Sequence, residues 1–383
     1  MVPNLSGEIK YLKIKKAEGQ KALSLISNNF RKYSVINQRY KILYDDKFIF
    51  FPLERNNDLI EKVIKFIENK IDSEIICKIG VINKNYKFKS LQDALKGKIP
   101  NLYQQLIPKS YDLIGNIAII EFDEFENIKN KNLSYYKKEI AKAITIINKK
   151  IISVYEKKSR IMGTYRLREL DLLYGKDISE TIYKENNCIY KLDVKKTYFT
   201  PRFGYEHRRV AFSDIKKNEQ IVDMFAGVGS FSIQIGKNHK VKIYAFDVNP
   251  DAYNYLKENI KINKLKGEII PYNLNAKDLL KSSNILGKSL QGKSDRILMN
   301  LPERSIDFVD VACFLMKKTG GLLHFYQFSK KPNPIGRTIE LLNNKLNNLN
   351  WVIDKILLSK IVKSYSPKAE LIVVDLLMRY SKF

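Results

Sequence analysis

The carboxyl-terminal half of the chain repeats a regular order of short apolar runs and longer amphipathic segments. Five apolar runs have the length of a single strand, and helix-length segments separate them. They are residues 220–225, 242–247, 267–272, 296–300 and 321–326. This order predicts a doubly wound, mostly parallel sheet. Two further apolar runs, 351–361 and 370–377, have no helix-length segment between them and predict an antiparallel pair that closes the sheet.

The amino-terminal part of the chain has the pattern of a smaller α/β unit. Residues 11–15 alternate like a strand, and residues 17–29 carry apolar side chains at helical spacing. The runs 40–44 and 48–53 flank a short polar turn and predict a hairpin. A helical linker is expected to follow from Asn56 to about residue 71.

The middle of the chain predicts a second small α/β region. A loop after residue 106 leads into an apolar strand that ends near residue 120, and residues 160–168 and 189–199 resemble further strands. Between them, residues 134–154 predict a basic helix with one apolar face: Ile140, Ala143, Ile144 and Ile147. We expect this face to pack on a sheet and the lysine face to be solvated, with phosphate contact as the second interpretation.

These patterns divide the chain into three domains. Residues 1–65 form a small domain with its linker, residues 66–200 a middle α/β domain, and residues 201–383 the doubly wound domain. The predicted fold class is therefore α/β, with a Rossmann-like domain that ends in an antiparallel pair and is preceded by two smaller α/β domains.

The composition indicates a polyanionic partner and excludes several classes of protein. The 68 Lys and Arg residues exceed the 41 Asp and Glu residues and give a net charge of +27, which suits a nucleic acid. A lysine-rich, AT-rich genome is the alternative explanation. No apolar run is long enough to span a membrane, and the amino end lacks a signal-peptide pattern. Three scattered cysteines without CxxC spacing predict reduced thiols in the cytoplasm and no metal site: Cys77, Cys188 and Cys313.

The residues at the ends of the first and second predicted strands of the large domain are of the types that line a cofactor pocket. Gly227 and Gly229 allow a tight turn that approaches a ligand closely, and Asp247 ends the next strand, where it would accept hydrogen bonds from a ribose. Ser232 stands where a dinucleotide fingerprint has its third glycine, which argues against a nicotinamide. The pattern favours an S-adenosylmethionine-dependent methyltransferase of the Rossmann-like class. For Asp247 the alternative is a cap of the following helix.

Two asparagines follow the third and fourth strands of this domain. Asn275 stands where an acidic adenine contact is common, and its amide would still bond adenine; the alternative is an ordinary turn. In Asn300-Leu301-Pro302 the proline fixes the turn, so that the Asn300 amide would face the edge of a nucleobase. A simple β-turn is again the alternative.

Several segments together resemble one known family. The chain is similar to the archaeal and eukaryotic tRNA (guanine-37-N1)-methyltransferases, and to archaeal members most closely. The likeness covers nearly the whole chain, including the amino-terminal unit. Its most specific segments are residues 108–120, 163–166, 198–210, 223–231, 299–302, 365–367 and 375–376.

The resemblance implies a role for each of several residues. Glu206 would be the general base that removes the N1 proton, Arg166 would stabilise the charge on O6, and Asn300 would hold the guanine edge. Without the family, Glu206 would be assigned to a surface ion pair and Arg166 to a solvated strand. The implied cofactor contacts are Phe225, Gly227, Gly229, Asp247, Val248, Asn275, Asn300 and Pro302. The implied substrate contacts are Tyr198, Pro201, Arg202, His207 and Arg208.

The resemblance also implies a partner, tRNA, held at its anticodon loop and docked at its elbow by the amino-terminal domain. Three positions depart from the family pattern: Asn116, His207 and Asn275. A second interpretation is an enzyme that also methylates C7 of a tricyclic wyosine intermediate, or one that transfers an aminocarboxypropyl group. A methyltransferase acting on ribosomal RNA or protein, and a tRNA-binding scaffold with a degenerate fold, also fit the pattern. We expect a monomer, because no self-complementary edge is evident.

Overall fold

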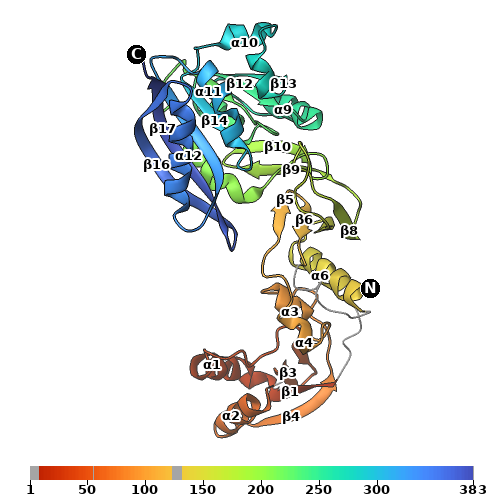
Figure 1. The fold of residues 1–383 in the computed structure, drawn as a ribbon. Coiled ribbons are helices and arrows are strands. Elements are labelled where there is room, and N and C mark those ends of the chain that lie inside the picture. Colours follow the sequence, from red (N-terminus) through yellow and green to blue (C-terminus); the bar gives the residue numbers. More distant parts are fainter. Residues whose placement is uncertain (1–7, 55, 123–131, 383) are drawn as a thin grey trace. The chain divides into compact units, whose positions relative to one another are not determined.

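The computed structural model describes residues 8–54, 56–122 and 132–382 (Figure 1). The chain forms two compact units, residues 1–90 and 91–383. Each is described by itself below. In the part of the chain that the structure describes, no helix has both the length and the apolar character needed to cross a membrane.

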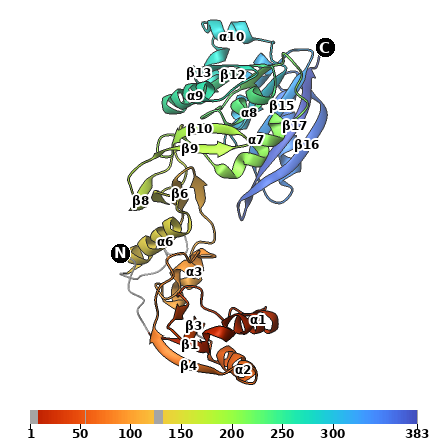
Figure 2. The ribbon, with the colours of Figure 1, turned by 180° about the vertical axis from the view of Figure 1, so that it is seen from behind.

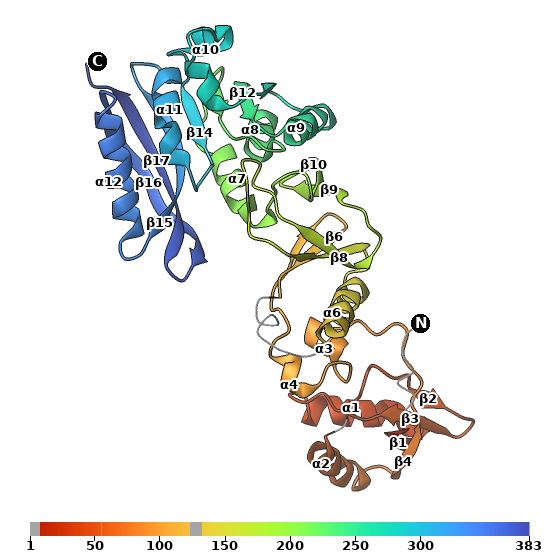
Figure 3. The same ribbon diagram turned by 45° about the vertical axis from the view of Figure 1, so that its right-hand side comes forward.

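The first unit is an antiparallel sheet with two helices packed on one face (Figure 3). Its strands lie in the order β2-β3-β1-β4. The helices are α1 (Gly19–Asn29) and α2 (Asn57–Glu68). The strands are β1 (Glu8–Lys15), β2 (Leu43–Tyr44), β3 (Phe48–Pro52) and β4 (Ser73–Ile79). The predicted first strand, helix and hairpin are all present, although β2 is only two residues long.

The predicted helix that begins at Asn56 is confirmed as α2, but its interpretation as a linker is wrong. Its side chains Ile60, Val63 and Ile67 are buried in the same core as Leu12 and Phe51. The polar residues at its start cap the helix, since the Asn56 side chain accepts a hydrogen bond from Leu59 N at 3.2 Å. A boundary after residue 65 would cut this helix. The three-domain division therefore stays a prediction, whereas the compact units meet at residue 90.

The amino-terminal part of the second unit contains a four-stranded sheet, in the order β5-β6-β7-β8, and the helix α6 (Leu133–Ile147). The apolar face of α6 is confirmed, because Ile140, Ala143 and Ile144 are fully buried. The helix ends earlier than expected because the chain turns into β7. The strands are β5 (Asp112–Ile114), β6 (Ile117–Ile120), β7 (Ser153–Lys157) and β8 (Leu170–Gly175), and two short helices, α3 (Leu91–Leu95) and α4 (Asn101–Gln104), precede them.

Two of the expected middle strands differ in the structure. Residues 160–168 form a turn instead of a strand, with Gly163 and Arg166 at φ values of 69° and 57° and an isolated bridge from Met162 to Leu167. Residues 188–193 form β10 (Cys188–Asp193), which pairs with β9 (Glu180–Glu185) and ends well before residue 199.

The large domain has the predicted doubly wound sheet, in the order β13-β12-β11-β14-β15-β17-β16. The first five of these strands are parallel and the last two are antiparallel, which confirms the terminal pair. The strands are β11 (Gln220–Asp223), β12 (Lys242–Asp247), β13 (Glu268–Asn273), β14 (Arg296–Met299), β15 (Gly321–Lys330), β16 (Trp351–Ser366) and β17 (Ala369–Tyr380).

Helices cover both faces of this sheet (Figures 1 and 2). Because successive strand residues point to opposite faces, Ile221 lies in one apolar core and Val222 in the other. The first core contains side chains of α7 (Gly204–Ala211), α8 (Ser230–Asn238) and α9 (Pro250–Ile262). The second contains side chains of α10 (Ile285–Leu290), α11 (Val309–Leu315) and α12 (Pro334–Asn347).

Asp223, at the end of β11, makes the stability of this domain depend on pH. It is 1% exposed, and burial raises its pKa to about 7 although the Ser232 hydroxyl donates a hydrogen bond to it. Between the unfolded value near 4 and this raised value the folded state binds more protons, so stability falls as pH rises. An Asp223→Asn variant should lose this dependence, which has an upper bound of about 4 kcal/mol. Melting temperatures of both proteins from pH 5 to 8 measure it, and parallel pH profiles would contradict the prediction.

Candidate functional site

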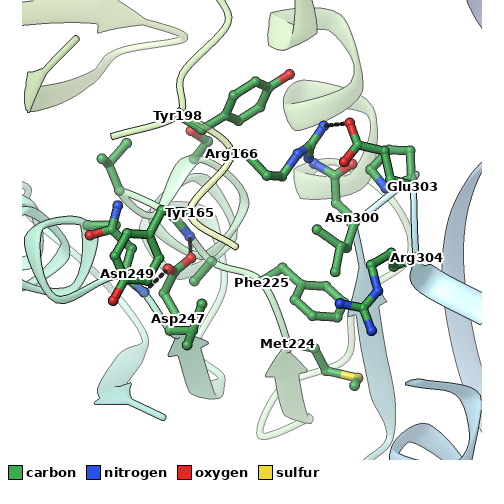
Figure 4. A pocket seen from close by; sticks show the side chains of 18 of the residues that line it. Tyr165, Arg166, Tyr198, Met224, Phe225, Asp247, Asn249, Asn300, Glu303 and Arg304 are labelled. Carbon is green, nitrogen blue, oxygen red and sulfur yellow. Dashed lines mark hydrogen bonds and ion pairs between the residues drawn. The ribbon is translucent and has the colours of Figure 1, made fainter. Parts of the chain in front are cut away.

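A cavity of about 430 Å³ lies at the carboxyl edge of β11, β12 and β14 (Figure 4). In the sheet β11 lies between β12 and β14, so the strand order reverses at this edge. Ligands of open α/β sheets bind at such a switch point. The loop of residues 163–166 from the first part of the unit forms a further wall.

The two glycines after β11 have different functions. Gly227 has a φ of 56° and lines the cavity, and a Cβ there would meet no atom within 4 Å. Gly229 has a φ of 96° and does not line the cavity. A Cβ there would lie 2.6 Å from Leu256 and 2.8 Å from Ile233. Gly227 therefore leaves room for a ligand, whereas Gly229 allows the close packing of α8 and α9.

Asp247 lines the cavity beside this turn. Its Oδ2 accepts a hydrogen bond from Gly227 N at 2.7 Å, and its Oδ1 accepts one from Asn249 N at 2.9 Å. The cap of α9 is Asn249, which accepts from Asp251 N, so Asp247 is not the helix cap. Burial raises the pKa of Asp247, and the two backbone amides act in the opposite direction. The backbone thus fixes a carboxylate that has lone pairs left for a hydroxyl donor.

The other expected cofactor contacts also lie on this cavity. Asn275 is exposed there, and its side-chain oxygen accepts from Lys277 N at 3.0 Å, so the turn interpretation holds for that oxygen. The same cavity is lined by Phe225, Val248, Asn300 and Pro302. A glycine turn, a fixed carboxylate and these apolar and amide walls suit a nucleoside-containing cofactor.

Arg166 extends over the cavity from an unusual backbone position. Its φ of 57° is uncommon for a residue with a side chain and indicates local strain. The guanidinium lies 4.4 Å from the centre of the Tyr198 ring and 3.5 Å from Glu303 Oε1. Figure 4 shows it beside Asn300. The buried Nε has no hydrogen-bond partner among the described residues, so one donor is free for a ligand.

Glu206 lies behind the cavity instead of lining it. It is 2% exposed, so the expected ion pair is present but is not at the surface. Its Oε2 accepts from Arg209 and from the Tyr326 hydroxyl, both at 2.9 Å, and its Oε1 pairs with Lys360 at 2.6 Å. The Tyr326 ring packs against Phe203, which does line the cavity. The carboxylate is therefore one layer of side chains from the cavity.

The environment of Glu206 favours its ionised form. Burial acts to raise the pKa of Glu206, but the hydrogen bonds from Arg209 and Lys360 outweigh burial and the pKa is lowered. A chain of buried groups holds Arg209 in turn: Asp375 Oδ2 lies 2.5 Å from its Nη1, and Asp375 Oδ1 lies 2.8 Å from His324 Nδ1. Burial lowers the pKa of His324, so this imidazole is neutral and donates to Asp375.

The expected substrate residues divide between two cavities and the surface. Tyr198 and His207 line the first cavity, and His207 Nδ1 lies 2.8 Å from Glu185 Oε1. Arg202 lines a second cavity and pairs with Asp112 at 2.6 Å. Pro201 and Arg208 line neither of these two cavities. The structure thus brings Arg166, Asn300, Tyr198 and His207 together, but not Glu206, Pro201 or Arg208.

The sequence interpretation missed three residues of the site. Glu303 pairs with Arg166, while Lys363 and Phe328 line both cavities. An acid directly after the Asn300-Leu301-Pro302 turn was a usable signal for Glu303. Lys363 stands two residues before the Tyr365-Ser366-Pro367 segment, but neither it nor Phe328 has a local pattern of its own.

Comparisons with known proteins agree with this geometry. The TRM5/TYW2 methyltransferase domain matches residues 181–353, and the TYW2 N-terminal domain matches residues 91–178. The Trm5b tRNA (guanine(37)-N(1))-methyltransferase of Pyrococcus abyssi is 38% identical over 72% of this chain and 77% of its own. That of Methanocaldococcus jannaschii is 33% identical over 95% and 97%. A solved complex of aTrm5 and tRNALeu has a TM-score of 0.69 at 31% identity and covers 96% of this chain and 99% of its own.

Two relatives have other chemistries at the same tRNA position. A tRNA(Phe) (4-demethylwyosine(37)-C(7)) aminocarboxypropyltransferase of M. jannaschii is 33% identical over 69% of this chain and 96% of its own. The tRNA 4-demethylwyosine(37)-methyltransferase Taw21 of Saccharolobus solfataricus is 34% identical over 71% and 95%. These matches cover less of this chain than the M. jannaschii Trm5b does.

Proposed function

Because this chain belongs to the archaeal TRM5/TYW2 family of methyltransferases, we infer that it transfers a methyl group from S-adenosylmethionine to N1 of guanine 37 in tRNA. The relative with 95% coverage is named for this reaction. The observation that carries the inference is the cavity itself. It joins Gly227 and Asp247 at a cofactor end to Arg166 and Asn300 at the opposite wall.

The cofactor end fits S-adenosylmethionine. We propose that Asp247 accepts hydrogen bonds from the ribose diol, that Gly227 lets the backbone approach the ligand, and that Asn275 and Val248 lie at the adenine. Asp247 is held by two backbone amides and keeps acceptor capacity, and the space beside Gly227 is open. The bound cofactor supplies an electrophilic methyl group.

The opposite wall fits a guanine. Guanine N1 carries a proton at neutral pH and becomes a nucleophile as that proton leaves, while negative charge develops on O6. We propose that Arg166 donates to O6, because its Nε is buried without a partner among the described residues. The amide of Asn300, on the same cavity, would hold the edge of the base.

We propose Glu206 as the general base that takes the N1 proton, through a bridging water or after a side-chain movement, because its carboxylate lies one layer of side chains behind the cavity. Its carboxylate is ionised at neutral pH, since Arg209 and Lys360 lower its pKa. The same contacts make it a weak base while they last. Lys360 is 29% exposed, so an RNA phosphate could replace Glu206 as its partner. That exchange would raise the pKa of Glu206 and free Oε1 for the proton.

We propose that the RNA partner is tRNA, held by the second unit at the anticodon loop and by the first unit at the elbow. The net charge of +27 suits a polyanion, and binding should weaken steeply with salt. The target guanine would have to leave the stack of the anticodon loop to enter the cavity.

Mass spectrometry of nucleosides tests the proposed function. Unmodified tRNA incubated with the protein and S-adenosylmethionine should yield N1-methylguanosine, and tRNA with adenine at position 37 should yield no methylated product. A product from the adenine substrate, or none from the guanine substrate, would contradict the assignment.

The same measurement separates the related chemistries. A tRNA carrying the tricyclic wyosine precursor would yield a C7-methylated base if the chain shares the Taw21 activity, or an aminocarboxypropyl product if it shares that of the transferase. Calorimetry with S-adenosylmethionine distinguishes an enzyme from a scaffold, since a degenerate site would not bind the cofactor.

A further inference from the structure

A second cavity of about 620 Å³ adjoins the first. It lies among β16, the loop of residues 160–168 and the segment that follows β10. Residues that line both cavities form a shared wall: Arg166, Tyr198, Phe199, Thr200, Phe328 and Lys363. The two cavities are therefore neighbours, so the next nucleotide of a strand whose base occupies the first cavity would lie near the second.

The second cavity carries an excess of positive charge. Two carboxylates line it, Asp112 and Glu121, and six cationic side chains oppose them. Asp112 is already engaged by Arg202 at 2.6 Å and Lys157 at 3.4 Å. The six cations are Lys157, Arg160, Arg166, Arg168, Arg202 and Lys363. Among the described residues Arg160, Arg168 and Lys363 form no ion pair with an acidic side chain, so these charges can meet an anion from outside.

Lys363 lies among the other cations of this cavity. Burial lowers its pKa, and the nearby cations Arg202, Arg166 and Arg168 lower it further, while Asp112 acts in the opposite direction. Its ammonium lies 5.6 Å from the centre of the Phe203 ring, on the wall toward the first cavity. A phosphate between these groups would relieve their mutual repulsion and stabilise the charged lysine.

An aromatic pair lies at the same cavity. The rings of Phe328 and Tyr365 are stacked, with centroids 4.0 Å apart and planes at 29°. Phe328 lies in the shared wall, and Tyr365 is 53% exposed. Exposed aromatic rings beside cations are the usual surface on which a nucleobase stacks while its phosphate is held.

We propose that the second cavity binds the nucleotide next to the target guanine in the same RNA strand, with its base on Tyr365 and its phosphate at Lys363, Arg168 and Arg160. This subsite rests on the proposed function, because it needs an RNA whose target base occupies the first cavity. It would hold the strand in the extruded form and so contribute to affinity and positioning.

Hairpin RNAs with the sequence of the anticodon stem and loop test the subsite. Each hairpin lacks the base of one nucleotide that flanks the target. For the full-length wild-type protein, one of these abasic RNAs should bind about 5- to 150-fold more weakly in fluorescence anisotropy. The Tyr365→Ala variant should bind the intact RNA more weakly than the wild type does, by the same factor. Its affinity for that abasic RNA should be no lower than its affinity for the intact RNA. Tyr365→Phe should keep wild-type affinity.

The controls separate the subsite from the proposed function. Tyr174 is also exposed but lines neither cavity, and Tyr174→Ala should bind every RNA as the wild type does. Arg168→Gln should reduce the slope of log affinity against log salt by about one phosphate contact. The subsite would be overturned if the wild type bound the intact and both abasic RNAs with equal affinity. It would also be overturned if the loss of affinity from removing the base and the loss from Tyr365→Ala multiplied when both changes were combined. Formation of N1-methylguanosine by the wild type would leave the proposed function standing in either case.

Discussion

A Glu206→Gln enzyme is expected to transfer methyl groups about 10²- to 10⁴-fold more slowly than the wild type under single-turnover conditions. Gln keeps the size of the side chain and accepts hydrogen bonds from Arg209 and Tyr326, but it cannot take a proton from guanine N1. The binding of S-adenosylmethionine, measured by calorimetry, should not change, since Glu206 does not line the cavity that holds the proposed cofactor site.

A second buried glutamate provides the matched control for this prediction. Glu156 is 4% exposed and pairs with Lys137 at 2.5 Å, so Glu156→Gln also removes a buried ionic partner, but outside the site. If both variants lose the same activity and the same melting temperature, the effect of Glu206→Gln is structural. Full methylation by Glu206→Gln would exclude it as the base.

A Lys360→Gln variant tests the role of Glu206 as the base independently. If Lys360 lowers the pKa of Glu206 and leaves it when RNA binds, Lys360→Gln would weaken tRNA binding while sparing the rate at saturation. If Glu206 instead stayed paired with Lys360 during the reaction, Lys360→Gln would change the rate of methyl transfer and its dependence on pH. The two outcomes separate a phosphate contact from a permanent part of the base.

The large domain could be predicted from the sequence because its signals are local. Each strand is a short apolar run, and a helix-length spacer follows each of the first four directly, so the doubly wound class of the sheet needed no long-range information, whereas the order of its strands was not predicted. The glycine turn was equally local, since Gly227 and Gly229 take positive φ values that other residues avoid. The ends of the strands then placed Asp247 and Asn300 on one edge.

The parts that failed depend on contacts between distant residues. Nothing near Glu206 in the sequence shows that Tyr326, 120 residues later, or Lys360 would bury it. The helix α2 was interpreted as a linker because its core partners, Leu12 and Phe51, belong to other elements. The turn at residues 163–166 was missed although Gly163 was a local signal for it, and the positive φ of Arg166 has no sequence signal at all.

An Arg166→Ala enzyme is expected to lose about 10²- to 10³-fold in the rate of methyl transfer at saturating tRNA, the range for removal of one preorganised donor to a developing oxyanion. Stacking on Tyr198 and pairing with Glu303 fix the guanidinium of Arg166 over the cavity, and its Nε has no partner among the described residues. Arg166→Lys keeps the charge but not the planar fork, so its rate should fall between those of wild type and Arg166→Ala.

The Arg304→Ala variant is the control for Arg166→Ala. It separates the loss of charge stabilisation at O6 from a general loss of positive charge at the cavity. Arg304 also lines the first cavity, but it is 65% exposed and pairs with Asp307 at 3.0 Å, so Arg304→Ala should change the rate by less than about tenfold.

Because Arg166 also lines the second cavity, its removal should weaken RNA binding as well. Single-turnover rates at saturating RNA remove that contribution. A wild-type rate under those conditions would assign Arg166 to binding the strand, and the charge on O6 would then need another donor, for which the Asn300 amide on the same cavity is a candidate.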